Sequence, residues 1–309
     1  MQKMIVILGP TASGKTRLAV EVARRLNGEV VSVDSRQVYR DMDIGTGKDL
    51  DEYRTDNQTI PYHLINIVDA GAEYNLYQFQ QDFNRVLPSI LAHGRVPVLC
   101  GGTGLYLEAI LKGHQFTAIP PNTALRLELD DFTNEELRER FRQTPSTYTD
   151  LADTSTRKRL IRAIEIATHL AENPQTALPD SVTLPAATVF GLDLPVERRR
   201  QRITERLHHR LQTGLIEEVH QLLARGIPAE KLIFYGLEYK FITQYLQGEL
   251  DYPTMVARLE TAIHQFAKRQ MTFFRKLERD GLNIRWLDGQ LPTAALADTI
   301  IADFQKLTP

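Results

Sequence analysis

The chain has 309 residues, enough for one large domain or two smaller ones with a sizeable hydrophobic core. Apolar residues make up 42% and charged residues 25%, and the net charge of −2 excludes a polycationic protein, so nucleic-acid binding would need a local basic surface. The single cysteine, Cys100, excludes an intrachain disulfide framework and a cysteine-rich zinc site.

The chain opens directly on an apolar strand pattern, without the features of a signal or transit segment. No apolar run approaches the length of a transmembrane helix. We therefore expect a cytoplasmic protein that makes no membrane contact.

A glycine-containing loop follows the first predicted strand. Residues 4–8 predict this strand, and apolar residues at helical spacing predict a helix over 15–26. The loop between them fills every fixed position of the pattern G-x-x-x-x-G-K-[ST]: Gly9, Pro10, Thr11, Ala12, Ser13, Gly14, Lys15 and Thr16. Its backbone N–H groups can bind a diphosphate or polyphosphate, Lys15 adds a positive charge, and the Thr16 hydroxyl can bind Mg²⁺. The strand and helix flanks disfavour the alternative, a turn that only caps a helix.

Strands and helices alternate as far as residue 111. The pattern predicts strands over 29–33, 62–67 and 96–100, and helices over 76–93 and 105–111. This alternation is typical of a parallel sheet with helices on both faces. Ligands bind beyond the carboxyl ends of such strands, where the phosphate loop, Asp34 and the turn at 101–104 would meet.

Two polar residues follow predicted strands at this edge. Asp34 could act as a general base, bind Mg²⁺ indirectly or cap a following helix, and the nearby phosphate loop favours a catalytic role. Thr103 could bind a ligand or cap the helix after it.

The pattern changes after residue 112. Prolines 120 and 121 interrupt the chain, and a charged, weakly helical stretch follows over 124–141. We predict a small helical insertion over 113–154 in a catalytic core formed by 1–112 and 155–309. Beyond it, the sequence predicts helices over 156–170, 196–225, 235–246 and 252–277 and a strand over 188–192. The predicted fold is therefore an α/β P-loop parallel sheet flanked by helices, with a small helical insertion and a helical C-terminal part.

Basic residues gather in three helical segments. Two are the runs 157–162 and 198–206, and the third is the second half of the last predicted helix: Lys268, Arg269, Arg275, Lys276 and Arg279. They could be solvated helix faces, favourable charges near a helix C-terminus, or surfaces for a polyanion. The last helix also carries a predicted core stripe: Met255, Leu259, Ile263, Phe266, Phe273 and Leu277.

Seven segments occur in a fixed order along nearly the whole chain: 9–16, 34–39, 42–46, 101–106, 159–165, 214–219 and 267–275. The segment Asp-Ser-Arg-Gln-Val-Tyr at 34–39 is far more specific than the phosphate loop. Together they resemble the tRNA dimethylallyltransferases, also called tRNA isopentenyltransferases. The resemblance implies transfer of a dimethylallyl group from dimethylallyl diphosphate to N6 of the adenosine just 3′ of the anticodon in a subset of tRNAs.

The resemblance also implies roles for individual residues. Asp34 would be the base, while Lys15, Thr16 with Mg²⁺, the loop amides and Arg206 would stabilise the leaving diphosphate. The implied tRNA contacts are Asp34, Ser35, Arg36, Gln37, Thr103, Lys158, Arg159, Leu160, Ile161 and Arg162. The expected partners are the tRNA anticodon stem-loop and dimethylallyl diphosphate, with no protein partner.

The sequence departs from the family pattern in two places. The insertion is shorter than usual, and segment 235–240 differs from the commoner Gly-Tyr-[Arg/Lys]-Glu arrangement, so we assign no site there. The alternatives are an adenylate isopentenyltransferase, a P-loop kinase or NTPase, and a non-catalytic RNA-binding module. The basic helices and the long C-terminal half favour tRNA over a small nucleotide.

Overall fold

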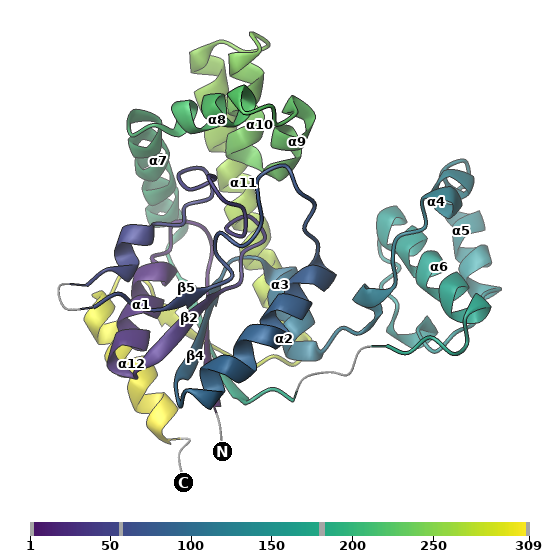
Figure 1. Ribbon diagram of the computed structural model, residues 1–309, viewed down its shortest axis with the longest axis horizontal. Helices are drawn as coiled ribbons and strands as arrows, with labels where there is room; N and C mark the ends of the chain where they lie inside the picture. Colours follow the sequence, from purple (N-terminus) through teal and green to yellow (C-terminus); the bar gives the residue numbers. More distant parts are fainter. Residues whose placement is uncertain (1–2, 56–57, 179–182, 307–309) are drawn as a thin grey trace. The chain divides into compact units, whose positions relative to one another are not determined.

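The computed structural model describes residues 3–55, 58–178 and 183–306. The chain divides into two compact units (Figure 1). The larger unit comprises Met1–Leu111 and Thr183–Pro309, and the smaller one comprises Lys112–Val182.

The larger unit is built on a six-stranded sheet with the strand order β3-β2-β4-β1-β5-β6. Every pairing in it is parallel, which confirms the predicted sheet. The strands are β1 (Lys3–Leu8), β2 (Gly28–Ser32), β3 (Tyr62–His63), β4 (Val96–Gly101), β5 (Ala186–Asp193) and β6 (Ile284–Asp288). The sequence prediction missed β6. It also made β3 too long, because Leu64 and Asn66 have φ angles of 61° and 58°, which end the extended conformation.

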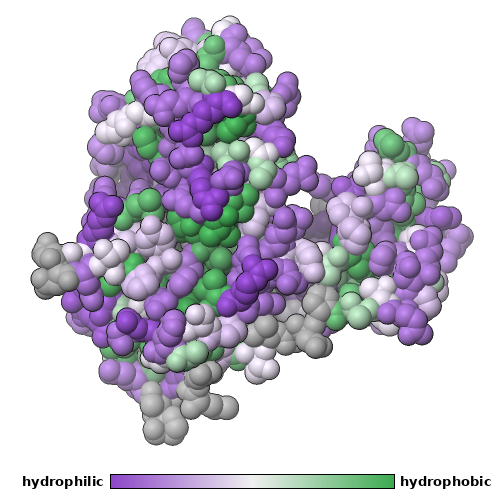
Figure 2. Space-filling model, in the orientation of Figure 1, coloured by the Kyte–Doolittle hydropathy of each residue, from purple (hydrophilic) through white to green (hydrophobic). Residues whose placement is uncertain are grey.

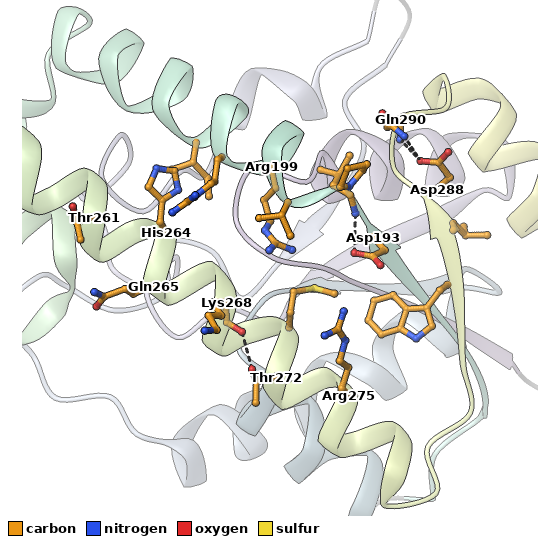
Figure 3. Close-up of a pocket in the computed structure, with 18 residues that line it drawn as sticks. Asp193, Arg199, Thr261, His264, Gln265, Lys268, Thr272, Arg275, Asp288 and Gln290 are labelled. Carbon is orange, nitrogen blue, oxygen red and sulfur yellow. Dashed lines mark hydrogen bonds between the residues drawn. The ribbon is translucent and has the colours of Figure 1, made fainter.

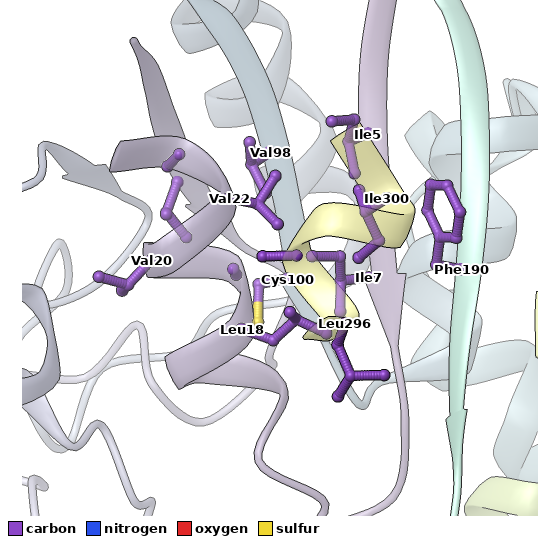
Figure 4. Packing of buried hydrophobic residues seen from close by; sticks show 14 of the residues in the cluster. Ile5, Ile7, Leu18, Val20, Val22, Val98, Cys100, Phe190, Leu296 and Ile300 are labelled. Carbon is purple, nitrogen blue, oxygen red and sulfur yellow. The ribbon is translucent and has the colours of Figure 1, made fainter. Parts of the chain in front are cut away.

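Helices cover both faces of the sheet (Figure 1). One face carries α1 (Lys15–Arg25) and α12 (Thr293–Lys306), and the other carries α2 (Leu76–Ala92) and α3 (Gly104–Lys112). Figure 4 shows the core on the first face, where side chains of α1 and α12 pack on those of the strands. Its labelled members are Ile5, Ile7, Leu18, Val20, Val22, Val98, Cys100, Phe190, Leu296 and Ile300. Cys100 is buried among them, as the apolar strand around it predicts.

Five further helices form the C-terminal part of the larger unit: α7 (Val196–Gln212), α8 (Leu215–Ala224), α9 (Ala229–Tyr235), α10 (Leu237–Leu246) and α11 (Tyr252–Arg279). The prediction of one helix over 196–225 is wrong, because Gly214 has a φ angle of 106° and separates α7 from α8. Gly236, with a φ angle of 155°, likewise separates α9 from α10. None of the helices that the structure describes is long and apolar enough to cross a membrane.

The smaller unit contains α4 (Thr123–Asp130), α5 (Asn134–Arg142) and α6 (Arg157–Glu172). It extends further than the insertion predicted over 113–154, because α6 belongs to it. Leu160 and Ile164 of α6 are buried against Leu129 and Leu137, so the three helices share one core. The predicted stretch 124–141 is two helices, since Thr133 begins α5 with a capping box.

Candidate functional site

The loop 9–16 joins the end of β1 to the start of α1. Ala12 and Gly14 have φ angles of 60° and 88°, so the chain turns twice through the left-handed region. This conformation turns successive backbone N–H groups toward one concavity, next to the positive end of the α1 dipole. The loop therefore has the shape of an anion cradle.

Lys15 lies at the centre of this cradle. Its Nζ is 3.4 Å from the backbone oxygen of Pro10. Burial lowers the pKa of Lys15, Cys100 and Asp34 oppose this shift, and Arg206 adds to it. An ammonium group that has lost hydration gains more from a bound anion than one in bulk water.

A pocket of about 840 Å³ brings most of the predicted site residues together. They come from the loops after β1, β2 and β4 and from α7, and they are Thr11, Ala12, Ser13, Gly14, Lys15, Thr16, Asp34, Ser35, Arg36, Gln37, Thr103 and Arg206. Gly9 and Pro10 are buried behind them. The loops that bring these residues together lie at the carboxyl ends of parallel strands, as predicted.

Asp34 closes a tight turn instead of capping a helix. Its Oδ1 accepts a hydrogen bond from the backbone N of Arg36 at 2.9 Å, and residues 35–38 form a turn with no helix after it. The neighbouring backbone N of Ser35 donates to Thr103 Oγ1 at 3.1 Å. Asp34 Oδ2 has no hydrogen bond to any residue in the described part of the chain, so it is free to accept a proton or a donor in the pocket.

Arg36 and Gln37 both have partners inside the protein. Gln37 Oε1 accepts from Ser32 Oγ at 2.7 Å, and its Nε2 donates to the backbone oxygen of Gly47 at 3.0 Å. The Arg36 guanidinium donates to the backbone oxygen of Phe234 at 3.1 Å and lies over its ring. Gln37 therefore shapes the wall of the pocket, while the exposed Arg36–Phe234 pair lies at its surface.

Three arginines four residues apart on α7 face the pocket: Arg202, Arg206 and Arg210. Arg202 donates to the backbone oxygens of Ser13 and Gly289 at 3.5 and 3.4 Å, so it joins α7 to the phosphate loop. Arg206 forms an ion pair with Asp49 at 2.6 Å. The sequence prediction named only Arg206, although the four-residue spacing places all three on one helix face.

Gln270 of α11 connects two glycine-containing loops. Its Oε1 accepts from the backbone N of Thr11, and its Nε2 donates to the backbone oxygen of Gly102, both at 2.9 Å. A Cβ at Gly102 would lie 2.5 Å from Gln270 Nε2, so only glycine allows this approach. Sequence reasoning included Gln270 in a family segment but gave it no role, because this contact spans 259 residues of sequence from Thr11.

Apolar side chains line the pocket beside these polar groups. Ile263, Phe266 and Phe273 of α11 and Leu105 of α3 all face it. Phe266 is 40% exposed and Leu105 48%, so the prediction that Phe266 belongs to the core is wrong. Figure 2 shows apolar surface gathered in the middle of the larger unit, in the region of α3 and α11. The pocket thus combines a cationic end with an apolar wall.

The remaining predicted residues lie on α6 of the smaller unit. Lys158 is exposed, Arg159 pairs with Asp153 at 2.8 Å, and Arg162 donates to the backbone oxygen of Ile119 at 2.5 Å. Leu160 is only 2% exposed and belongs to the core of this unit, so its side chain cannot contact a tRNA. Ile161 packs against the same core. Lys158 and Arg159 are therefore the exposed cations of this segment.

The basic residues of α11 separate into groups. Arg269 lines the pocket with the phosphate loop, and Lys276 pairs with Glu108 and Asp280 at 3.2 and 3.4 Å. Lys268 and Arg275 line a second pocket of about 1120 Å³ together with Arg199 of α7 (Figure 3). These three side chains have no ion-pair partner among the residues that the structure describes, so their charge is available to a polyanion.

The donor set suits Mg²⁺ held jointly with a phosphate ligand. Thr16 provides a hydroxyl at the start of α1, and the carboxylates of Asp34, Asp49 and Glu52 line the same pocket. The described residues contain no cluster of three or more histidine, cysteine or acidic side chains that could hold a metal alone. Mg²⁺ commonly binds one or two protein ligands, waters and substrate phosphates, so these residues fit it.

Known proteins are similar to this chain along most of its length. A family profile described as IPP transferase matches residues 37–277, and one described as isopentenyl transferase matches residues 2–60. A tRNA dimethylallyltransferase 2 of Porphyromonas gingivalis is 52% identical over 96% of this chain and 98% of its own length. A tRNA dimethylallyltransferase 1 of Geotalea uraniireducens is 51% identical over 93% of this chain and 92% of its own length.

A solved structure gives the same result. The tRNA isopentenylpyrophosphate transferase of Bacillus halodurans is 28% identical, with a TM-score of 0.70 over 99% of this chain and 98% of its own length. The profile match spans most of the chain, and the identity to the two relatives is about one half over nearly their full lengths. The chain therefore belongs to the IPP transferase family, to which it is joined by both sequence and fold.

Proposed function

We propose that this protein transfers the dimethylallyl group of dimethylallyl diphosphate to N6 of the adenosine that follows the anticodon in certain tRNAs. One observation carries the proposal: the phosphate loop, Asp34, Thr103 and Arg206 line a single pocket. An anion cradle beside a free carboxylate oxygen suits a reaction in which a diphosphate leaves while a nitrogen is alkylated. The names of the relatives at about half identity support the same activity.

In this reaction N6 of the adenine attacks C1 of the dimethylallyl group. The bond from C1 to the bridging oxygen breaks, and its electron pair leaves with the diphosphate. The nitrogen then carries an extra proton, which Asp34 Oδ2 accepts. Adenine N6 is a weak nucleophile because its lone pair is delocalised into the ring, so a positioned base assists the attack.

Negative charge grows on the diphosphate as the C1–O bond breaks. Lys15, Arg206 and the N–H groups of the phosphate loop provide fixed positive charge and donors at that place. Mg²⁺ on Thr16 would neutralise further charge on the leaving group. The apolar side chains Phe266 and Phe273 line the same pocket, where they can hold the prenyl chain away from water.

The target base must leave the anticodon loop to reach the pocket. An unpaired loop base is easier to extrude than a base-paired one. We assign the contact with this nucleotide to Thr103 and the neighbouring segment 34–37. We assign contacts with the phosphate backbone of the anticodon stem to the smaller unit. Because the proposed substrate is a tRNA, we assign the activity to the cytoplasm.

The competing functions make different demands on the site. A kinase or NTPase needs the phosphate loop, and a prenyl donor needs in addition an apolar wall beside it. An adenylate isopentenyltransferase needs the pocket but no cationic surface such as Lys268, Arg275 and Arg199. Both features together favour a prenyl donor and a polyanionic acceptor.

The test is incubation with labelled dimethylallyl diphosphate and unmodified tRNA, with AMP and ATP in parallel reactions. We expect label in the tRNA, mapping to the adenosine next to the anticodon, and transfer at least about a hundredfold slower by Asp34→Asn. Label only in AMP or ATP would assign the protein to free-nucleotide prenylation. ATP turnover without prenyl transfer would assign it to the P-loop kinases or NTPases.

A further inference from the structure

Arg206, which the proposed function assigns to the diphosphate, already has a carboxylate partner. Its Nη2 lies 2.6 Å from Asp49 Oδ2, and both residues line the pocket of the phosphate loop. A diphosphate and Asp49 therefore compete for one guanidinium group. If Arg206 turned to the diphosphate, Asp49, whose side chain is 39% exposed, would lose its charge-assisted hydrogen bond unless another donor took the place of Arg206.

Arg210, one turn further along α7, offers the unused donor. Its side chain is 11% exposed, and its Nη2 is buried without a hydrogen-bond partner among the described residues. This nitrogen lies 3.8 Å from Asp49 Oδ1. A movement of about 1 Å would make a hydrogen bond of ordinary length.

Glu238 lies on the other side of Arg210. Its Oε1 is 4.0 Å from Arg210 Nη1, on the first turn of α10. Burial lowers the pKa of Arg210 to about 10 and raises that of Glu238, so both charged forms are held in a poorly hydrated wall. Glu238 keeps the guanidinium of Arg210 at this wall, between two carboxylates.

The loop that carries Asp49 is anchored from outside the pocket. Glu218 accepts the backbone N–H groups of Asp43, Ile44 and Gly45 at 2.7, 2.7 and 3.0 Å. The buried Lys48 Nζ, next to Asp49 in the chain, donates to Tyr39 and Asp43 at 2.6 and 2.5 Å. These contacts hold the backbone beside Asp49, so a change of partner would need only rotation of the Asp49 side chain.

The close packing of the two guanidinium groups against Gly47 supports the same arrangement. A Cβ at Gly47 would collide with Nη2 of both Arg206 and Arg210. The glycine thus leaves both arginines room beside Asp49.

We propose that Arg210 is a positioning residue that takes over the Asp49 carboxylate when Arg206 turns to the diphosphate. Arg210 acts through Asp49 and makes no contact with the diphosphate itself. This exchange keeps the Asp49 carboxylate paired while Arg206 binds the diphosphate. The proposal rests on the proposed function, because it assumes a diphosphate in the phosphate loop.

The test is a double-mutant cycle of Arg210→Met and Asp49→Asn. Binding of inorganic pyrophosphate with Mg²⁺ is measured by titration calorimetry, and KM and kcat are measured with dimethylallyl diphosphate. We expect Arg210→Met alone to weaken pyrophosphate binding and raise KM about tenfold, with little change in kcat. In the Asp49→Asn background the same substitution should change binding less than about twofold, because no carboxylate then needs a second partner.

Other results would overturn the proposal. An equal loss in both backgrounds would mean that Arg210 contacts the diphosphate directly, and no loss in either would mean that Asp49 needs no second partner. Arg210→Lys retains the charge and should bind pyrophosphate nearly as the unaltered protein does. Unfolding temperatures of all variants identify a loss that comes from folding alone. Failure of the unaltered protein to bind pyrophosphate would instead contradict the proposed function, while binding without the coupling would contradict only the exchange.

Discussion

Gln270 and Thr11 are 259 residues apart in sequence, yet Gln270 Oε1 accepts the backbone N–H of Thr11 at 2.9 Å. The same side chain holds Gly102 through its Nε2. The position of the phosphate loop therefore depends on a helix near the end of the chain as well as on its own sequence.

We predict that Gln270→Leu raises KM for dimethylallyl diphosphate about tenfold. The substitution leaves a loop N–H and a carbonyl without their partner, at about 1–3 kcal/mol each when buried. Steady-state kinetics measure the effect, and Gln265→Leu, an exposed position on the same helix, is the matched control. Equal kinetics for the two variants would contradict a positioning role for Gln270.

Asp34→Asn should lower kcat about a hundredfold or more and leave tRNA binding nearly unchanged. The amide retains the size of the side chain but cannot accept the proton from N6. Single-turnover rates with tRNA saturating measure the chemical step. Asp41→Asn, which removes a surface pair with Arg225, should retain the full rate, and a rapid Asp34→Asn enzyme would contradict the assignment of the base.

The affinity for the diphosphate should fall as pH rises through the lowered pKa of Lys15. Burial lowers the pKa of Lys15, and a bound anion raises it again, so the complex holds more protons than the empty site. Binding is therefore strongest below the pKa of the empty site and weakens as pH rises through it. Calorimetric titration of Lys15→Arg at the same pH values is the control, since arginine stays charged and the ligand titrates identically. If the affinity for the diphosphate changes with pH in the same way in both proteins, the prediction is contradicted.

Neighbouring basic residues at the start of α6 should behave differently. Arg157 donates to the backbone oxygens of Phe132, Leu129 and Asp130 at 2.6, 3.1 and 2.7 Å, so Arg157→Ala should destabilise the smaller unit by about 1–3 kcal/mol. Lys158 is exposed, and Lys158→Ala should leave unfolding unchanged while it reduces the salt dependence of tRNA binding by about one ion. Urea unfolding and filter binding at several salt concentrations measure the two effects. Destabilisation by Lys158→Ala together with a reduced salt dependence of tRNA binding in Arg157→Ala would contradict both roles.

Arg275→Ala should also reduce the salt dependence of tRNA binding by about one ion, because Arg275 lines the second pocket with Lys268 and Arg199. Arg279→Ala, one turn further along the same helix, is the matched control and should leave the slope unchanged. If Arg275→Ala and the unaltered protein show the same salt dependence of tRNA binding, the basic residues of the second pocket form only a solvated helix face.

The sequence predicts the first half of the fold well because its signals there are local. The apolar run at 4–8, the glycine loop and the following helix are contiguous, so both the strand and the phosphate loop could be read directly. β6 is five residues long with charged residues at its second and last positions, and its role depends on pairing with β5, which no local pattern reports. The helix breaks at Gly214 and Gly236 depend on single backbone angles, which apolar periodicity does not reveal.

The sequence likewise predicts only those residues of the site whose signals are local. Asp34 and Thr103 could be placed because they follow strands that share an edge of the sheet. Gln270 and Arg210 could not, since each acts on groups far away in sequence. The position of Phe266 in the apolar stripe of α11 is equally consistent with burial in the core and with a place in the pocket wall. Only the packing of α11 shows that Phe266 faces the pocket.

The packing of α1 against α12 has a consequence for protein synthesis. Leu296 and Ile300 complete the core around the helix that carries Lys15 and Thr16, and Arg25 of α1 pairs with Asp298 of α12 at 2.6 Å. α12 begins 278 residues after α1 (293 − 15), so the helix with the phosphate loop is synthesised long before the helix that covers it. During translation part of the apolar face of α1 therefore stays exposed to solvent until α12 is made. A nascent chain that stalls before α12 exposes apolar surface that chaperones can bind.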